Sequence, residues 1–133
     1  MEVRFAYTAL QVASIDASEE FYTSIFGMQR LLRKKVSETK GEMCVLKSGS
    51  GSLELNWYEK ALLKKGNNLD HLAFEVQTIE EFRRLMRRLR AKKIGIHEYL
   101  ETNGWNRFFI TDPDRNWVEV FVRKPSTADG SVP

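Results

Sequence analysis

The sequence predicts an α+β protein made of two βαβββ modules, each with one helix packed on a mixed sheet. The first observation behind this prediction is the order of the elements, because strand, helix and three strands follow one another in both halves of the chain. The second is an internal repeat. HLAFEV at 71–76 lies 64 residues after YTALQV at 7–12, and VEV at 118–120 lies 65 residues after LEL at 53–55. Two matches at nearly one offset indicate duplicated modules.

Strands are expected where apolar residues form β-rich runs or alternate with polar ones. These runs lie at 3–12, 28–36, 42–47 and 52–58 in the first half, and at 69–76, 96–100, 106–111 and 116–123 in the second. Successive side chains of a strand point to opposite faces of a sheet. The aliphatic face of each strand is therefore expected to pack under a helix, which leaves the other face free of helices.

Helices are expected at 17–26 and 79–92, because apolar residues recur there at helical spacing. A candidate capping residue precedes each helix, and a glutamate follows it three positions later in the first turn: Asp16 with Glu19, and Thr78 with Glu81. The apolar stripes are Phe21, Tyr22, Ile25 and Phe26 in the first helix, and Phe82, Leu85, Met86 and Leu89 in the second. Each stripe is expected to face the sheet of its own module.

The chain is expected to contain a first module at 1–58, a linker at 59–68, a second module at 69–123 and a disordered tail at 124–133. The linker has the sequence EKALLKKGNN and the tail KPSTADGSVP. These boundaries follow from where the strands of each module begin and end.

Composition and charge narrow the classes of function. The chain has 133 residues, of which 42% are hydrophobic and 29% charged, and its single cysteine excludes a disulfide scaffold. The net charge of +3 is local, because residues 80–93 alone carry seven Lys or Arg and two Glu. These charges are expected on the solvated face of one helix, so no nucleic-acid partner is expected. The chain lacks an apolar run of roughly 20 residues and a signal-peptide core, which predicts a soluble cytoplasmic protein without a membrane partner.

Four residues at repeat-equivalent positions are expected on the helix-free faces: Tyr7 and Glu54 in the first module, and His71 and Glu119 in the second. A carboxylate in mid-strand with aliphatic neighbours costs free energy unless something compensates its charge. Each residue alone has a simpler interpretation, as an exposed glutamate or a structural histidine. Together, one imidazole and two carboxylates predict a site for one divalent metal ion (Zn, Ni, Co, Mn or Fe), completed by water. Cys44 is expected to pack as a small hydrophobe.

The chain resembles the vicinal oxygen chelate superfamily, which includes glyoxalase I, bleomycin and fosfomycin resistance proteins and extradiol dioxygenases. The resemblance runs over about residues 3–123. The stretches that carry it are LQVASIDASEEFYTSIFGMQ (10–29), LELNWY (53–58), DHLAFEV (70–76) and DPDRNWVEVF (112–121). It implies paired βαβββ modules that form a cupped, partly open mixed β-sheet around a metal, with the helices on the outer face.

The resemblance places the family's four ligand positions at Tyr7, Glu54, His71 and Glu119. Glyoxalase I has His, Glu, His and Glu there, so three positions match and the first departs. Glu54 without the first histidine is typical of the glyoxalase-like branch rather than of the dioxygenases. Tyr7 would ligate weakly, donate a hydrogen bond to a metal-bound water or fill space, and we favour the second role. Arg115 replaces the glycine of the family's DPDG turn.

By the same resemblance, the chain is expected to be a metal-dependent isomerase or lyase acting on a small α-oxygenated carbonyl substrate through a metal-stabilised enediolate. Glu119 or Glu54 would be the catalytic base that moves the proton. Gln11 and Tyr58 stand where bacterial glyoxalase I has an arginine and an asparagine that hold glutathione, so glutathione dependence is not expected. The residues expected to contact the substrate are Tyr7, Gln11, Tyr58, Trp105, Trp117 and Phe121.

Two other interpretations stay open. One is a non-catalytic small-molecule-binding protein of the same fold, for drug resistance by sequestration or for sensing. Bleomycin-type binders lack the ligand carboxylates, so the presence of Glu54, His71 and Glu119 argues against this class. The other is a metal-dependent dioxygenase or transferase. The resemblance also implies a homodimer, because small members of the superfamily pair.

Overall fold

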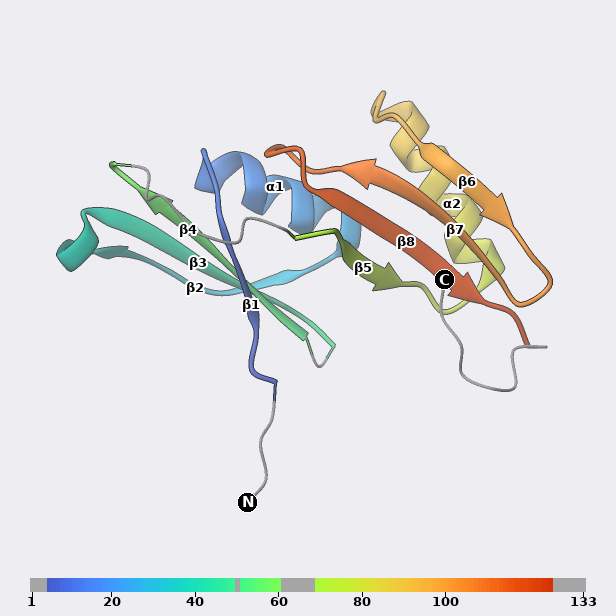
Figure 1. Cartoon of the computed structure of the whole chain (residues 1–133), viewed down its shortest axis with the longest axis horizontal. Helices are drawn as coiled ribbons and strands as arrows, with labels where there is room; N and C mark the ends of the chain where they lie inside the picture. Colours follow the sequence, from blue (N-terminus) through green and yellow to red (C-terminus); the bar gives the residue numbers. More distant parts are fainter. Residues whose placement is uncertain (1–4, 50, 61–68, 126–133) are drawn as a thin grey trace, which may run out of the picture. The chain divides into compact units, whose positions relative to one another are not determined.

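The computed structural model describes residues 5–49, 51–60 and 69–125 (Figure 1). The chain divides into two compact units, Met1–Asn67 and Asn68–Pro133, and each unit has its own sheet and its own long helix. Most of the predicted linker and of the predicted disordered tail lies outside the described residues. Among the helices of the described residues, none has the length and apolar character needed to span a membrane.

The first unit is a four-stranded sheet with one long helix. Its elements are β1 (Thr8–Gln11), α1 (Ile15–Phe26), β2 (Gln29–Val36), the short 3₁₀ helix η1 (Ser37–Thr39), β3 (Gly41–Ser48) and β4 (Gly51–Tyr58). The strands lie in the order β1-β4-β3-β2, with β1 parallel to β4 and the other neighbours antiparallel. Helix α1 packs against β3 and β4. The sequence did not predict η1, and β1 begins later than the predicted strand.

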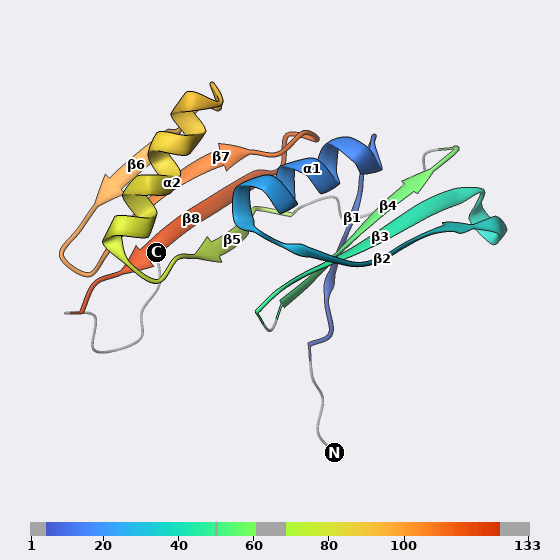
Figure 2. The ribbon, with the colours of Figure 1, turned by 180° about the vertical axis from the view of Figure 1, so that it is seen from behind.

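The second unit repeats this arrangement. Its elements are β5 (Leu72–Glu75), α2 (Ile79–Ala91), β6 (His97–Glu101), β7 (Trp105–Thr111) and β8 (Trp117–Arg123). The strands lie in the order β5-β8-β7-β6, with β5 parallel to β8 and the other neighbours antiparallel. Helix α2 crosses one face of this sheet and packs against β8 (Figure 2).

The strand register confirms the internal repeat. Ala9 of β1 lies opposite Glu54 of β4, and Ala73 of β5 lies opposite Glu119 of β8. The partners of the two glutamates are 64 residues apart and the glutamates themselves 65, the offsets at which the sequence segments align. The predicted α+β class with two βαβββ modules and open mixed sheets is therefore confirmed.

The cores lie between each helix and the aliphatic face of its sheet, as strand alternation predicts. In the second unit, Val118, Val120 and Val122 of β8 are at most 1% exposed. Phe108 of β7 contacts Phe82 of α2, with ring centroids 5.1 Å apart. Buried residues of the first core include Tyr22, Ile25, Cys44, Leu53 and Leu55. The expected packing of Cys44 is thus confirmed, and burial raises the pKa of its thiol.

One predicted helix cap is wrong. Helix α1 begins at Ile15, and its N-cap is Ser14, whose extended backbone (φ −148°, ψ 117°) lets the side chain accept a hydrogen bond from the Ala17 N–H. Asp16 lies inside the first turn, where its carboxylate instead contacts Arg33 of β2 at 2.8 Å. The predicted cap of α2 is confirmed, because the Thr78 hydroxyl accepts from the backbone of the glutamate three residues later.

Candidate functional site

His71 and Glu119 form a pair on the helix-free face of the second sheet. His71 lies directly before β5 and Glu119 lies in the middle of the neighbouring strand β8. The Nε2 atom of His71 is 4.0 Å from Oε1 of Glu119, and its Nδ1 atom is 2.6 Å from a carboxylate oxygen of Asp70. A histidine that ligates a metal commonly donates its second ring N–H to a carboxylate in this way. The imidazole is therefore oriented with one nitrogen toward Glu119.

The environment of Glu119 is unusual for a carboxylate. Its exposed fraction is 4%, and no hydrogen bond to its side chain is found in the described part of the chain. Burial raises the pKa of this carboxyl, while the nearby His71 and Arg107 lower it by less. An ionised carboxylate buried without hydrogen bonds is costly, and a cation held beside it would compensate that cost. A carboxylate and an imidazole are also ligands that suit Zn, Mn, Fe, Co or Ni.

Tyr7 and Glu54 take the equivalent places in the first unit, in a more polar environment. Glu54 of β4 is half-buried and accepts a hydrogen bond from Asn56 Nδ2 at 3.1 Å. Tyr7 lies directly before β1 with an exposed fraction of 52%. The strand register thus places a second carboxylate at the position that Glu119 has in the other module.

Each unit supplies two of the four predicted ligands. Within residues 5–49, 51–60 and 69–125, no group of three or more His, Cys, Asp or Glu side chains is placed to hold a metal ion. The structure brings His71 and Glu119 together, and the complete ligand set with Glu54 and Tyr7 stays a prediction.

A row of aromatic rings extends from His71 across the second sheet. Phe109 of β7 contacts the His71 ring edge-on at 5.3 Å between centroids, and Trp117 contacts Phe109 at 5.7 Å. His97 contacts Trp117 in turn, at 5.6 Å. The sequence interpretation missed Phe109, although alternation along β7 and the pairing of Phe109 with Glu119 place it on this face.

The predicted substrate-contact residues differ in exposure. In the second unit Phe121 is 7% exposed, Trp105 is half-buried and Trp117 is 42% exposed. In the first unit Gln11 is exposed on β1, and Tyr58 is half-buried at the end of β4. Among these residues, Trp117 is the only one for which the described part of the chain shows a link to the His71 and Glu119 pair. Its ring contacts Phe109, which in turn contacts His71.

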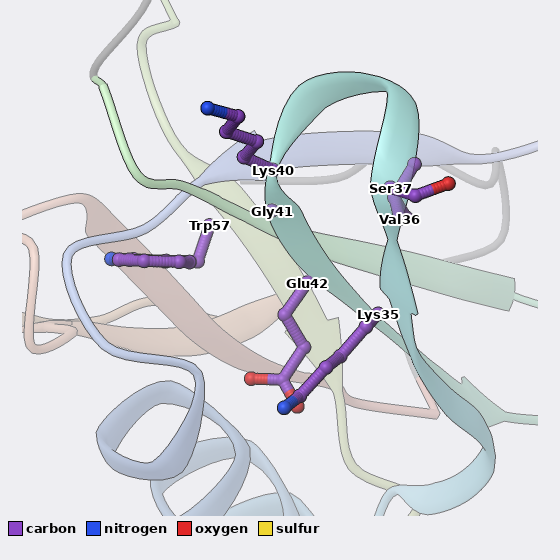
Figure 3. Close-up of a pocket in the computed structure, with 7 residues that line it drawn as sticks. All are labelled: Lys35, Val36, Ser37, Lys40, Gly41, Glu42 and Trp57. Carbon is purple, nitrogen blue, oxygen red and sulfur yellow. The ribbon is translucent and has the colours of Figure 1, made fainter.

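A separate cavity of about 540 Å³ opens in the first unit at the turn between β2 and β3 (Figure 3). Its lining residues are Lys35, Val36, Ser37, Lys40, Gly41, Glu42 and Trp57. No predicted metal ligand lines it. Trp57 lies on β4 beyond the buried leucines and is 36% exposed.

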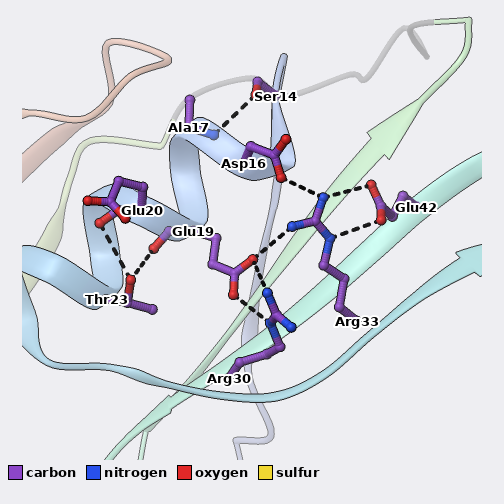
Figure 4. A network of polar contacts seen from close by, with 9 residues as sticks. All are labelled: Ser14, Asp16, Ala17, Glu19, Glu20, Thr23, Arg30, Arg33 and Glu42. Carbon is purple, nitrogen blue, oxygen red and sulfur yellow. Dashed lines mark hydrogen bonds and ion pairs between the residues drawn. The ribbon is translucent and has the colours of Figure 1, made fainter.

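An ion network ties α1 to the first sheet on its helix-covered side (Figure 4). The guanidinium of Arg33 contacts three carboxylates, those of Glu42, Glu19 and Asp16, at 2.8–2.9 Å. Arg30 also bonds Glu19 and holds the pKa of that carboxyl below its usual value. Each charged side chain of this network contacts one of opposite charge, so the network links the helix to the sheet.

Known proteins share this fold over nearly the whole chain. A "Probable lactoylglutathione lyase" of Vibrio cholerae is 35% identical and covers 94% of both chains. A "Probable trivalent organoarsenical cleaving enzyme" of Bacillus subtilis is 26% identical over 94% of this chain and 84% of its own. The fosfomycin resistance protein FosX of Listeria monocytogenes, solved with Mn(II), superposes with a TM-score of 0.71 at 16% identity, over 90% of this chain and 92% of its own.

A family model settles the relationship. It describes the Glyoxalase/Bleomycin resistance protein/Dioxygenase superfamily and matches residues 4–120. The match spans both modules and includes the four predicted ligand positions. The chain therefore belongs to the glyoxalase/bleomycin resistance protein/dioxygenase superfamily.

Proposed function

We propose that the chain binds one divalent metal ion through His71, Glu119 and Glu54, and that it is an isomerase or lyase for a small α-oxygenated carbonyl compound. The observation that carries the proposal is the pair of His71 and Glu119, with an oriented imidazole 4.0 Å from a buried carboxylate. Two relatives support it: the V. cholerae protein is described as a lyase, and the FosX structure contains Mn(II). Tyr7 would act near the metal as a hydrogen-bond donor.

The donor set fits a divalent metal. One imidazole nitrogen and two carboxylates match the hard-to-borderline ligands of Zn, Ni, Co, Mn and Fe. The contact of His71 with Asp70 would fix the tautomer in which Nε2 carries the lone pair for the ion. When bound, such an ion supplies Lewis-acid stabilisation of negative charge that develops on a carbonyl oxygen.

The proton transfer would use a carboxylate of this site. Removal of a proton from the carbon next to a carbonyl requires a base within hydrogen-bond reach of that carbon. Glu119 and Glu54 are the two candidates. Phe109 and Trp117 would form an apolar wall beside the reacting carbon and limit the access of water to it.

Glutathione would not be the co-substrate, although the V. cholerae relative is described as a lactoylglutathione lyase. The proposal rests on Gln11, which lacks the positive charge of the arginine expected there, and on Tyr58, which lacks the side-chain amide of the asparagine expected there. A direct comparison of turnover with and without glutathione tests it.

Metal analysis of the purified protein tests the site. The wild type is expected to contain about one metal ion per chain after loading with Zn, Ni, Co or Mn, and His71→Ala to lose it. His97→Ala is the matched control, because His97 is the other histidine of the chain and is expected to leave the metal content unchanged. Absence of metal uptake by the wild type would contradict the proposal.

Turnover is tested separately from metal content. The loaded protein is expected to catalyse exchange of the α-proton of small hydroxycarbonyl compounds for deuterium, measured by NMR, and Glu54→Gln or Glu119→Gln to abolish it. Light scattering coupled to gel filtration tests the homodimer that the resemblance implies. Metal uptake without exchange on any α-oxygenated carbonyl compound would favour the non-catalytic binder instead.

A further inference from the structure

Arg107 lies on the same sheet face as Glu119. Along β7 the side chains of Phe108 and Ile110 are fully buried, and Phe108 contacts the helix α2, so Arg107 and Phe109 point to the opposite face. The register pairs Phe109 with Glu119 and Arg107 with Phe121. Arg107 is thus a diagonal neighbour of Glu119, a position about 7–8 Å away that long side chains can reach across.

The side chain of Arg107 is half-buried, and its guanidinium is poorly partnered. The side chain is 21% exposed, and its only described ion pair is a contact of 4.0 Å with Glu98, whose own side chain is 71% exposed. Such an exposed and distant pair contributes little. No hydrogen bond to this guanidinium is found among residues 5–49, 51–60 and 69–125. Its five N–H donors therefore have capacity for a further acceptor.

Two other arginines show what a partnered guanidinium looks like in this protein. Arg33 has almost the same side-chain exposure, 22%, and contacts three carboxylates at 2.8–2.9 Å. Arg123, on the same sheet as Arg107, lies 3.2 Å from a carboxylate oxygen of Glu75. Among these three arginines, Arg107 is the half-buried one that has no acceptor closer than 4.0 Å in the described part of the chain.

The surroundings of Arg107 fix its orientation. Its guanidinium carbon lies 4.9 Å from the centre of the Phe109 ring, in a cation–π contact. The same ring contacts His71. A planar guanidinium held over an aromatic ring presents its N–H fork in one direction, which suits two oxygens of a carboxylate or phosphonate.

We propose that Arg107 binds an anionic group, a carboxylate or a phosphonate, of the small molecule that reacts beside His71 and Glu119. The proposal rests on the proposed function and narrows its substrate to organic acids. The anionic group would bond to the guanidinium fork, and the apolar part of the molecule would lie along Phe109 and Trp117. Arg107 is then a specificity-determining residue.

Binding of three small probes to metal-free protein in EDTA tests the proposal, with affinities measured by calorimetry and the side-chain N–H signal of Arg107 followed by NMR. The probes are phenylglyoxylate, phenylphosphonate and the neutral methyl ester of phenylglyoxylic acid. At least one acid is expected to bind at least tenfold more tightly than the ester and to shift the Arg107 signal. Comparison of the two acids identifies whether a carboxylate or a phosphonate is preferred.

Two variants and a control complete the test. Arg107→Met is expected to weaken binding of the preferred acid at least tenfold without changing binding of the ester, and Arg107→Lys to retain part of the affinity. Arg123→Met, which removes a paired arginine from the same sheet, is expected to leave the selectivity for the acid unchanged. Equal binding of acid and ester, no binding of either acid, or equal binding of the acid by wild type and Arg107→Met would overturn the proposal.

Metal uptake is measured on the same samples to separate this inference from the proposed function. Acid binding that depends on Arg107 in a protein that takes up no metal contradicts the metal site and supports the role of Arg107. Metal uptake without acid selectivity contradicts the role of Arg107 alone.

Discussion

Glu119→Gln is expected to stabilise the metal-free protein, although it removes a residue of the proposed site. Glu119 is 4% exposed, and the opposite charges that partly compensate its carboxylate are Arg107 and, when it is protonated, the His71 imidazole at 4.0 Å. A buried group without a hydrogen bond costs about 1–3 kcal/mol when it is neutral, as a glutamine amide is, and more when it is charged. Glutamine keeps the shape of the side chain and removes the charge, so the free energy of unfolding is expected to rise by about 1–2 kcal/mol.

The gain depends on pH with a defined sign. Burial raises the pKa of Glu119 in the folded protein above its value in the unfolded chain. A carboxyl whose pKa is raised on folding contributes fully to the free energy of unfolding below its pKa in the unfolded chain, about 4.3. This contribution is lost as the pH rises through its pKa in the folded protein. The difference in free energy of unfolding between Glu119→Gln and the wild type is therefore expected to be close to zero near pH 4 and largest at pH 8.

Urea unfolding in EDTA at both pH values measures this difference. Glu54→Gln is the matched control, because Glu54 has the same register position but is half-buried and bonded to Asn56, and a change under about 0.5 kcal/mol is expected. Metal at 100 times its Kd is expected to reverse the order at pH 8, since it stabilises the wild type by about 2.7 kcal/mol and Glu119→Gln far less. A Glu119→Gln protein less stable than wild type in EDTA at pH 8 would refute the reasoning.

Three further predictions concern the scaffold. Arg33→Met removes a guanidinium bonded to three carboxylates, so it is expected to lower the free energy of unfolding by about 1–3 kcal/mol in urea titrations. Its control is Arg87→Met on the exposed face of α2, which should change that free energy by under about 0.5 kcal/mol. Ser14→Ala is expected to cost about 1 kcal/mol by the same measurement, and no loss would show that Ser14 does not cap α1. Cys44, which is 0% exposed and has a raised pKa, is expected to react with Ellman's reagent at pH 8 only after unfolding, and fast reaction of the native protein would contradict its burial.

The topology was predictable because it depends on patterns that cover many residues at once. Alternation along β8 assigns three valines to one face and Glu119 to the other, and a shift by one residue would expose the whole aliphatic face. The repeat then fixes which positions of the two sheets correspond. The cap of α1 was not predictable in this way. Ser14 and Asp16 both suit an N-cap, and the choice depends on which of them has an extended backbone.

The internal repeat predicted only some residues of the candidate site. Pairing β5 with β8 and β1 with β4 places His71, Glu119 and Glu54 on helix-free faces, as the sequence indicated. Arg107 and Phe109 were missed because their importance depends on burial and on partners. In the sequence, Arg107 is one of many arginines, and nothing distinguishes it from the solvated ones until its lack of a close acceptor is known.

A difference at one neighbouring position explains why Glu54 and Glu119 lie in different environments. Glu54 and Glu119 have the same register, but the residue two positions after Glu54 is Asn56, which donates a hydrogen bond to it, while the residue two positions after Glu119 is Phe121. A phenylalanine cannot donate this bond and is itself buried. The change therefore leaves one carboxylate without this hydrogen bond, an environment that a bound cation would compensate. Since the same module also has histidine where the first has Tyr7, we expect the second unit to supply most of the metal affinity in the proposed function.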